Sequence, residues 1–290
     1  MPAEMLLPEL ADLVSPDEEW EELGSGYQLA EGPVWYREGG YLLFSDIRNN
    51  RRMRWTPGQG VSVELEPSNF TNGMTRDGEG RLVFCEQSLR RVSRLEADGS
   101  ITIIADSFQG KRFNRPNDLV VHSNGTIYFT DPITGGIEPE LDFLGVYMVP
   151  PDLSGVHLLT DEVAFPNGLA LSVDEKQLYV NSSRVGLIHV YDVADDGSIR
   201  SGRVFCQLQG EGEGNPDGMK LDMQGNIYCT GPGGLWIIDP AGRHLGTIPV
   251  PGDHATNCAW GGDDWKTLFF TTFYTLRRIR MKVAGVPVPR

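Results

Sequence analysis

The chain alternates short apolar runs with turn residues in a pattern that recurs six times. Each copy begins with an oxygen-bearing side chain, the anchor, and 10 or 11 residues later continues into an apolar, β-branched and aromatic run. Turn sequences such as Ser123-Asn-Gly lie between anchor and run, which is typical of a two-stranded hairpin. The runs cover residues 42–46, 82–86, 127–131, 178–182, 227–231 and 268–272.

The anchors recur every 40 to 50 residues. Further strands are expected after the runs, at 91–95, 187–192 and 234–238, so one period holds four short strands and no long amphipathic helix. A β-propeller blade has this period and content, whereas a β-sandwich would not repeat an anchor, a turn and a strand in one order. The sequence therefore predicts an all-β, six-bladed β-propeller. Its anchors are Glu31, Asn72, Asn117, Asn167, Asp217 and Asn257.

No linker or shift in composition divides the chain. We predict a single propeller domain over residues 25–290 and an N-terminal extension over 1–24 that contains a short helix near 8–14. Propellers protect their sheet edges by closing into a ring. The segment before Glu31, including residues 26–29, is therefore expected to supply the strand that closes the ring with the last blade.

Charge and cysteine content narrow the class of protein. The chain carries 25 Lys and Arg against 40 Asp and Glu, a net charge of −15, which disfavours nucleic acid or an anionic membrane as the main partner. No apolar run approaches the roughly 18 residues that a spanning helix needs. The four cysteines form no CxxC pair, so free thiols, a reducing compartment and a cytoplasmic location are expected.

Structural equivalence places the six anchors in one ring around the propeller axis. Buried carboxylate and amide oxygens need a partner, and a cation can satisfy them all. An isolated Asn-Gly would indicate a turn, but Asn117 and Asn257 keep the oxygen without the glycine. Two carboxylates and four amides, with no His or Cys, favour a hard divalent ion at the centre. Ca²⁺ fits best, and Zn²⁺, Mg²⁺ and Mn²⁺ stay open.

Several stretches resemble a known family, the gluconolactonase and senescence-marker-protein (regucalcin-like) group of six-bladed propellers, with diisopropylfluorophosphatase as a more distant relative. The resemblance covers residues 29 to about 282. It implies a metal held by Glu31, Asn167 and Asp217, with Asn117 at the metal directly or through water, and Arg115 in contact with substrate. The matching stretches are Glu31-Gly-Pro-Val-Trp, Arg115-Pro-Asn-Asp, Phe165-Pro-Asn-Gly, Asn215-Pro-Asp-Gly and Thr256-Asn-Cys-Ala-Trp.

The resemblance also implies a reaction, the hydrolysis of a cyclic ester. Asp217 is the first candidate for the base that activates water, and Asp131, which ends its strand, is the second. Arg115 would orient the hydroxyls or a carboxylate of the lactone. Some relatives carry a substrate-binding acid after the position of Asp131, but here the sequence reads Asp131-Pro-Ile-Thr-Gly-Gly, which leaves specificity for sugar lactones open.

Two alternatives remain. The same ion could serve a phosphotriester (organophosphate) hydrolase, or the propeller could be a non-catalytic calcium-binding scaffold. A small-molecule lactone is the expected partner, and the oligomeric state is a monomer or a homodimer. The cluster around Arg48 is interpreted as a solvated hairpin tip, and His254 as an exposed loop residue.

Overall fold

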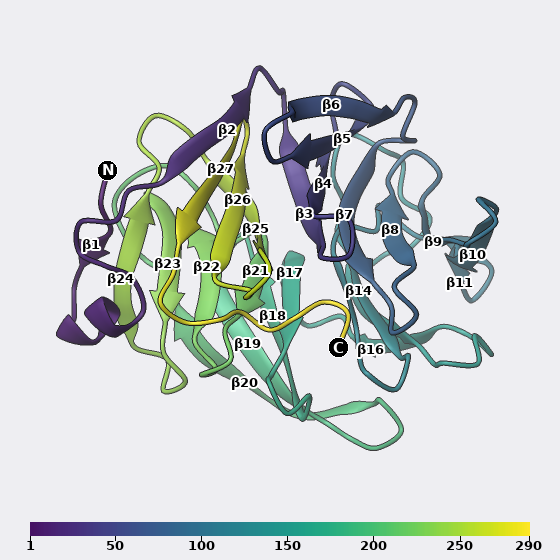
Figure 1. Ribbon diagram of the computed structural model, residues 1–290. Helices are drawn as coiled ribbons and strands as arrows, with labels where there is room; N and C mark the ends of the chain where they lie inside the picture. Colours follow the sequence, from purple (N-terminus) through teal and green to yellow (C-terminus); the bar gives the residue numbers. More distant parts are fainter.

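The computed structural model describes all residues from 1 to 290 and contains six antiparallel sheets around a common axis, five of four strands and one of five (Figure 1). The prediction of an all-β, six-bladed propeller is confirmed. Blades 1 to 3 comprise β3 (Ala30–Tyr36), β4 (Tyr41–Asp46), β5 (Arg51–Thr56) and β6 (Gly60–Leu65); β7 (Thr71–Arg76), β8 (Leu82–Glu86), β9 (Arg91–Leu95) and β10 (Ile101–Ala105); and β13 (Leu119–Val121), β14 (Ile127–Asp131), β15 (Gly145–Val149) and β16 (His157–Thr160).

The second half of the chain repeats this arrangement. Blades 4 to 6 comprise β17 (Pro166–Leu171), β18 (Gln177–Ser182), β19 (Leu187–Val193) and β20 (Ile199–Gln207); β21 (Met219–Leu221), β22 (Ile227–Gly231), β23 (Gly234–Ile238) and β24 (His244–Pro249); and β25 (Ala255–Gly261), β26 (Thr267–Thr272), β27 (Thr275–Arg280) and β2 (Glu21–Ser25). A small hairpin of β11 (Ser107–Phe108) and β12 (Lys111–Arg112) was not anticipated from the sequence.

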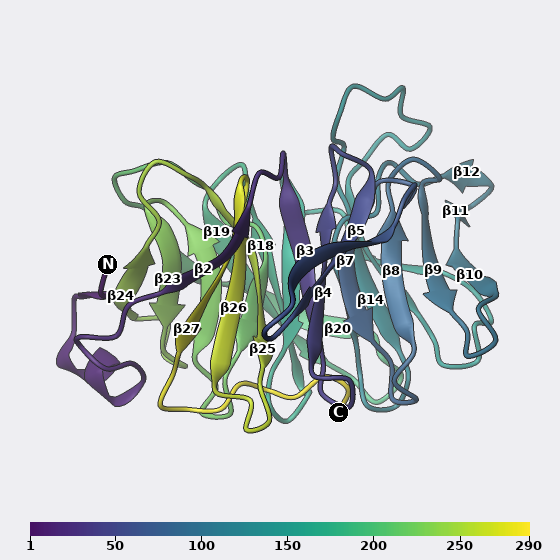
Figure 2. The ribbon, with the colours of Figure 1, turned by 45° about the horizontal axis from the view of Figure 1, so that its top comes forward.

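The N-terminal segment closes the ring, as expected, but through an earlier strand than the sequence suggested. β2 pairs antiparallel with β27, and Glu21 lies opposite Arg278 (Figure 2). Residues 26–29 are not that strand. Gly26 adopts φ +92°, which ends β2 and turns the chain into blade 1. The closing strand also crosses the expected boundary between residues 24 and 25.

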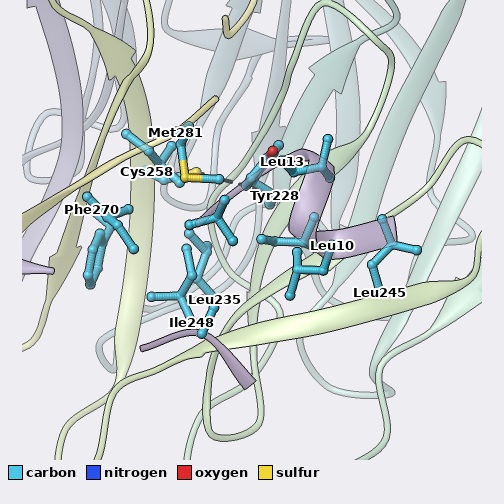
Figure 3. Close-up of a cluster of buried hydrophobic side chains, with 14 of the residues drawn as sticks. Leu10, Leu13, Tyr228, Leu235, Leu245, Ile248, Cys258, Phe270 and Met281 are labelled. Atoms are coloured by element: carbon cyan, nitrogen blue, oxygen red, sulfur yellow. Dashed lines mark hydrogen bonds between the residues drawn. The ribbon is translucent and has the colours of Figure 1, made fainter. Parts of the chain in front are cut away.

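The first residues of the chain extend blade 5. β1 (Glu4–Met5) adds to the edge of β24, and a 3-10 helix, η1 (Pro8–Asp12), follows it. Leu10 and Leu13 from this segment are buried against Leu235, Leu245 and Ile248 of blade 5 (Figure 3). Apolar burial of this kind stabilises the extension by roughly 2 kcal/mol per large side chain. The extension is therefore part of the folded unit.

The two faces of the propeller differ in what covers the central channel. On one face, which we call the loop face, lie the loops that follow the second strand of each blade. On the other, the C-terminal residues Val286, Val288 and Arg290 lie over the channel mouth. Arg290 donates to the carbonyl of Ser172 at 2.8 Å and pairs with Glu175 at 3.3 Å, which fixes the tail. Access to the channel from outside is therefore through the loop face.

All four cysteines are free, as expected. No helix in the structure has the length and apolar character required to cross a membrane.

Candidate metal centre and substrate cavity

The anchors face the channel because the first strand of a blade is irregular at that point. In β3 the pairing with β4 shifts between Glu31 and Val34, and in β17 the pairing with β18 shifts between Pro166 and Leu169. A bulge of this kind re-aims a side chain out of the alternation of the strand. Asn117 and Asp217 instead lie two residues before their strands begin.

The glycine after an anchor serves the contact between blades. A Cβ on Gly168 would lie 2.0 Å from the backbone oxygen of Asp217 in the next blade. A Cβ on Gly32 would lie 2.2 Å from the backbone oxygen of Asn72. These distances are far below any tolerated contact, so the anchors of adjacent blades approach closely only because glycine follows them. This packing requirement explains the Asn-Gly and Asp-Gly pairs without invoking a turn.

Side chains of the second strands hold the anchor carbonyls in place. Ser45 Oγ donates to the backbone oxygen of Asn72 at 2.8 Å, and Thr130 Oγ1 donates to that of Asn167 at 2.7 Å. Each bond joins one blade to the next. The backbone positions of Asn72 and Asn167 are therefore set by two blades, which helps to preorganise the ring.

One side of the ring is a chain of amides. Asn72 Nδ2 donates to Asn117 Oδ1 at 2.5 Å, Asn117 Nδ2 donates to Asn167 Oδ1, and Asn167 Nδ2 donates to Ser183 Oγ at 3.0 Å. These bonds orient the amide oxygens of Asn117 and Asn167, and each oxygen retains a second lone pair. Oδ1 of Asn72 is buried with no hydrogen-bond partner.

The other side of the ring holds the carboxylates. Asn257 Nδ2 donates to Glu31 Oε2 at 2.9 Å, and Glu31 Oε1 is buried without any partner. Below them, Lys220 Nζ lies 3.8 Å from Asp118 Oδ2 and donates to Asn257 Oδ1 at 3.3 Å. Lys220 thus pairs with Asp118, whereas Glu31 and Asp217 form no salt bridge, so these two supply the negative charge of the ring itself.

Burial and mutual repulsion raise the pKa of both carboxyl groups. The pKa of Glu31 rises to about 7, mainly through burial and then through the charge of Asp118, while the hydrogen bond from Asn257 opposes the rise. The pKa of Asp217 is raised well above its ordinary value by burial and then by the charge of Glu31. Without a cation, the folded protein therefore holds these groups against an electrostatic penalty.

The ring forms the floor of a cavity of about 460 Å³ on the loop face. This volume suits a small organic molecule. Glu31, Asn117, Asn167 and Asp217 line it, and so does Arg115. The structure therefore brings together all four predicted metal ligands and the predicted substrate contact.

Arg115 has no partner for its buried Nε, and burial, followed by the charge of Arg90, lowers its pKa. A Cβ on Gly135 would lie 2.1 Å from Arg115 Nη1, so this glycine makes room for the guanidinium. The Gly135 backbone adopts φ +67°, which glycine tolerates.

Asp131 does not reach the cavity. Its side chain is completely buried, and Oδ2 accepts a hydrogen bond at 2.7 Å from the backbone N–H of Asn114, next to Arg115. Burial raises its pKa to about 7. Asn257 is likewise behind the ring, where it holds Glu31.

Sequence reasoning missed three residues near the ring. Arg48 lines the cavity, although its cluster suggested only a solvated hairpin tip. Gln87, after the second strand of blade 2, also lines it, and Lys220 lies beneath the anchors. The signal for Arg48 and Gln87 was available, because both follow a second strand and therefore lie on the face where the first strands begin.

The donors fit a hard cation. No three His, Cys, Asp or Glu side chains gather into a metal-binding group, so an ion here would depend on the asparagine amides. The unpartnered oxygens Glu31 Oε1 and Asn72 Oδ1 mark where such an ion would satisfy buried groups. Carboxylate and amide oxygens are the ligands of Ca²⁺ and related ions.

Comparisons with known proteins find relatives of this chain. A family model described as "SMP-30/Gluconolactonase/LRE-like region" matches residues 29–274. A gluconolactonase of Zymomonas mobilis subsp. mobilis is 35% identical, over 91% of this chain and 82% of that protein. The structure of a gluconolactonase of Xanthomonas campestris superimposes with a TM-score of 0.88 at 32% identity, over 97% of this chain and 95% of the other.

A calcium-binding protein, the regucalcin of Agrobacterium tumefaciens, shares the fold. Its structure superimposes with a TM-score of 0.77 at 21% identity, over 93% of this chain and 96% of that one.

Proposed function

The chain belongs to the SMP-30/gluconolactonase/LRE-like family, and on that premise we propose that it is a metal-dependent lactonase. It would open a lactone by hydrolysis, with a divalent ion bound by Glu31, Asn117, Asn167 and Asp217. The relatives named as gluconolactonases support the reaction class. The observation that carries the metal dependence is the buried, unpartnered Oε1 of Glu31 beside the half-buried Asp217.

Ca²⁺ is the best candidate because every donor is oxygen and the protein supplies at most four of the six to eight oxygens that Ca²⁺ takes. When bound, a divalent ion polarises a carbonyl and stabilises the negative charge that develops on its oxygen. The shortage of protein ligands leaves room at the cavity for water and substrate. Zn²⁺, Mg²⁺ and Mn²⁺ remain to be compared.

The residues of the chain would divide the reaction between them. Asp217 would accept the proton from the attacking water, because its carboxylate lines the cavity where water and substrate meet. The water oxygen bonds to the carbonyl carbon, the ring C–O bond breaks, and the proton passes to the departing ring oxygen. The products are a hydroxyl group and a carboxylic acid, which ionises to a carboxylate and releases one proton to solvent.

Arg115 would orient the substrate, because its guanidinium lines the cavity and its Nε has no partner within the protein. Asp131 would act as a positioning residue rather than as the base. A base must reach water, whereas Asp131 is completely buried and holds the backbone of Asn114, next to Arg115.

A lactone panel tests the proposal. The protein is stripped with a chelator, refilled with Ca²⁺, Zn²⁺, Mg²⁺ or Mn²⁺, and assayed for proton release from each lactone. We expect turnover to disappear on chelation and to return with one ion in particular. Fluorophosphates in the same assay test the alternative phosphotriesterase. Absence of metal-restored turnover on every lactone would contradict the proposed function and leave the scaffold interpretation.

The four free cysteines are compatible with the expected cytoplasmic location, which stays a prediction.

A further inference from the structure

The wall of the cavity is positively charged, unlike the protein as a whole. Arg48 and Arg115 both line it, one from the loop after β4 and the other from the segment before β13. Neither guanidinium forms a salt bridge, whereas the nearby Arg51 and Arg90 pair with Glu66 and Glu140. The chain has 40 acidic and 25 basic residues, so acids to pair with these two arginines are abundant, and yet neither is paired.

Both side chains are held in place without an acid. The guanidinium of Arg48 lies over the ring of Phe273, 5.6 Å from its centroid, and Phe273 also lines the cavity. The ring of His254 also stacks on Phe273, with 5.0 Å between the centroids. Arg115 is fixed by its passage beside Gly135. Both arginines thus line the cavity without an acidic partner, and the buried Nε of Arg115 has no hydrogen-bond partner.

A further hydrogen-bonding group lines the same cavity. Thr134 Oγ1, on the loop that follows β14, lines the cavity and is also buried without a hydrogen-bond partner. Acids occur only on the floor, as Glu31 and Asp217, among the lining residues. Because Arg48 is exposed and Glu31 is buried, the cavity is cationic at its mouth and anionic at its floor.

We propose that the substrate carries an anionic group, a carboxylate or a phosphate, on the part of the lactone remote from the carbonyl. This inference rests on the proposed function. The lactone carbonyl would lie at the floor, beside Asp217, and the anion would lie at the mouth, where Arg48 and Arg115 donate charge-assisted hydrogen bonds. Arginine is well suited to this task, since its planar fork matches both anions. Arg48 thereby becomes the residue that determines specificity.

The experiment compares three lactones that differ at one position. One is an aldonolactone with a terminal hydroxymethyl group, one bears a carboxylate in its place, and one bears a phosphate on that hydroxymethyl. Turnover and calorimetric binding are measured with the metal-loaded protein and with R48A. The matched control is R37A, because Arg37 is an exposed arginine of the same blade, in the hairpin after β3 on the opposite face.

We expect R48A to lower kcat/KM and binding by about tenfold for the anionic lactones and by less than twofold for the neutral one. R37A should change none of them. Preference for the carboxylate or for the phosphate would identify the anion. The inference is overturned if the neutral lactone binds as tightly as both anions, or if R48A affects all three equally.

The two proposals fail separately. If no lactone is turned over while the anionic ones bind through Arg48, the proposed hydrolysis is wrong and the anion site stands. If only the neutral lactone is bound and hydrolysed, the hydrolysis stands and the anion site is wrong.

Discussion

Asn257 donates from Nδ2 to Oε2 of Glu31 at 2.9 Å, across the junction where the sixth blade meets the first. The same amide accepts from Lys220 at 3.3 Å through Oδ1. One oxygen of the Glu31 carboxylate is thus committed to the protein, and the other, which has no partner, is left for a ligand. The amide of Asn257 therefore orients the carboxylate from behind and need not contact the ion.

Replacing Asn257 with alanine should destabilise the fold. N257A leaves a buried carboxylate oxygen of Glu31 and the half-buried ammonium of Lys220 with fewer partners, which costs about 1–3 kcal/mol. Urea denaturation of the metal-free protein measures the loss. N215A is the control, because Asn215 is exposed. Equal stability of the two variants would contradict the role of Asn257.

Glu31→Gln should remove most of the ion affinity while the fold survives. The substitution keeps the shape of a buried side chain but removes one of the two negative charges of the ring itself. We expect Ca²⁺ binding by calorimetry to weaken by roughly tenfold or more, since one charge contact is worth about 1.5–3 kcal/mol. E162Q, at an exposed glutamate, should bind as the unaltered protein does. Unchanged binding in E31Q would place the ion elsewhere.

The stability of the chelated protein should fall as pH rises. The pKa of Glu31 is raised from an ordinary 4.5 to about 7 in the folded state, so the folded protein binds more protons than the unfolded chain between these values. By linkage, stability then decreases with rising pH across this window, by on the order of 3 kcal/mol for this group. Asp217 and Asp131, whose pKa values are also raised, act in the same direction.

Denaturation at pH 5 and pH 8, with chelator and with Ca²⁺, checks this dependence. The ion competes with protons for the same oxygens, so its stabilising effect should grow with pH. E31Q should flatten the curve measured in chelator. A chelated protein that is more stable at pH 8 than at pH 5 would disagree with the raised pKa values.

Gly168→Ala should disturb the ring without touching a polar side chain. Its new Cβ would lie 2.0 Å from the backbone oxygen of Asp217, so blades 4 and 5 must separate there. We expect a loss of about 1–3 kcal/mol in stability, together with weaker Ca²⁺ binding. G155A is the control, because a Cβ at Gly155 meets no atom within 4 Å. Native Ca²⁺ affinity in G168A would show that the inter-blade spacing is not critical.

The sequence was informative where a pattern repeats. The strands at 82–86, 127–131 and 227–231 were predicted with their observed bounds, because six equivalent segments reinforce one another. Convergence of the anchors followed from the same equivalence. The binding of a divalent ion by these anchors remains a proposal.

Prediction from the sequence failed where a single residue decides where a strand ends or what a side chain contacts. Gly26 turns the chain at a left-handed φ, so the closing strand ends at Ser25, and a local pattern could not show this. Asp131 looked available because it ends a strand, but its side chain is completely buried, and the backbone N–H of Asn114 bonds one of its carboxylate oxygens. Arg48 was expected at a solvated hairpin tip because its cluster follows the first inner strand, but its side chain also lines the cavity.

The pairing of β2 with β27 also constrains how the molecule is made. Arg278 bonds to Glu21 across 257 positions of sequence, so β2, the outer strand of the sixth blade, leaves the ribosome long before its neighbour β27 exists. Contacts between such distant segments form slowly. Five blades can assemble during synthesis while β2 has no partner strand. During that interval the unpaired edge of β2 exposes the nascent chain most to aggregation.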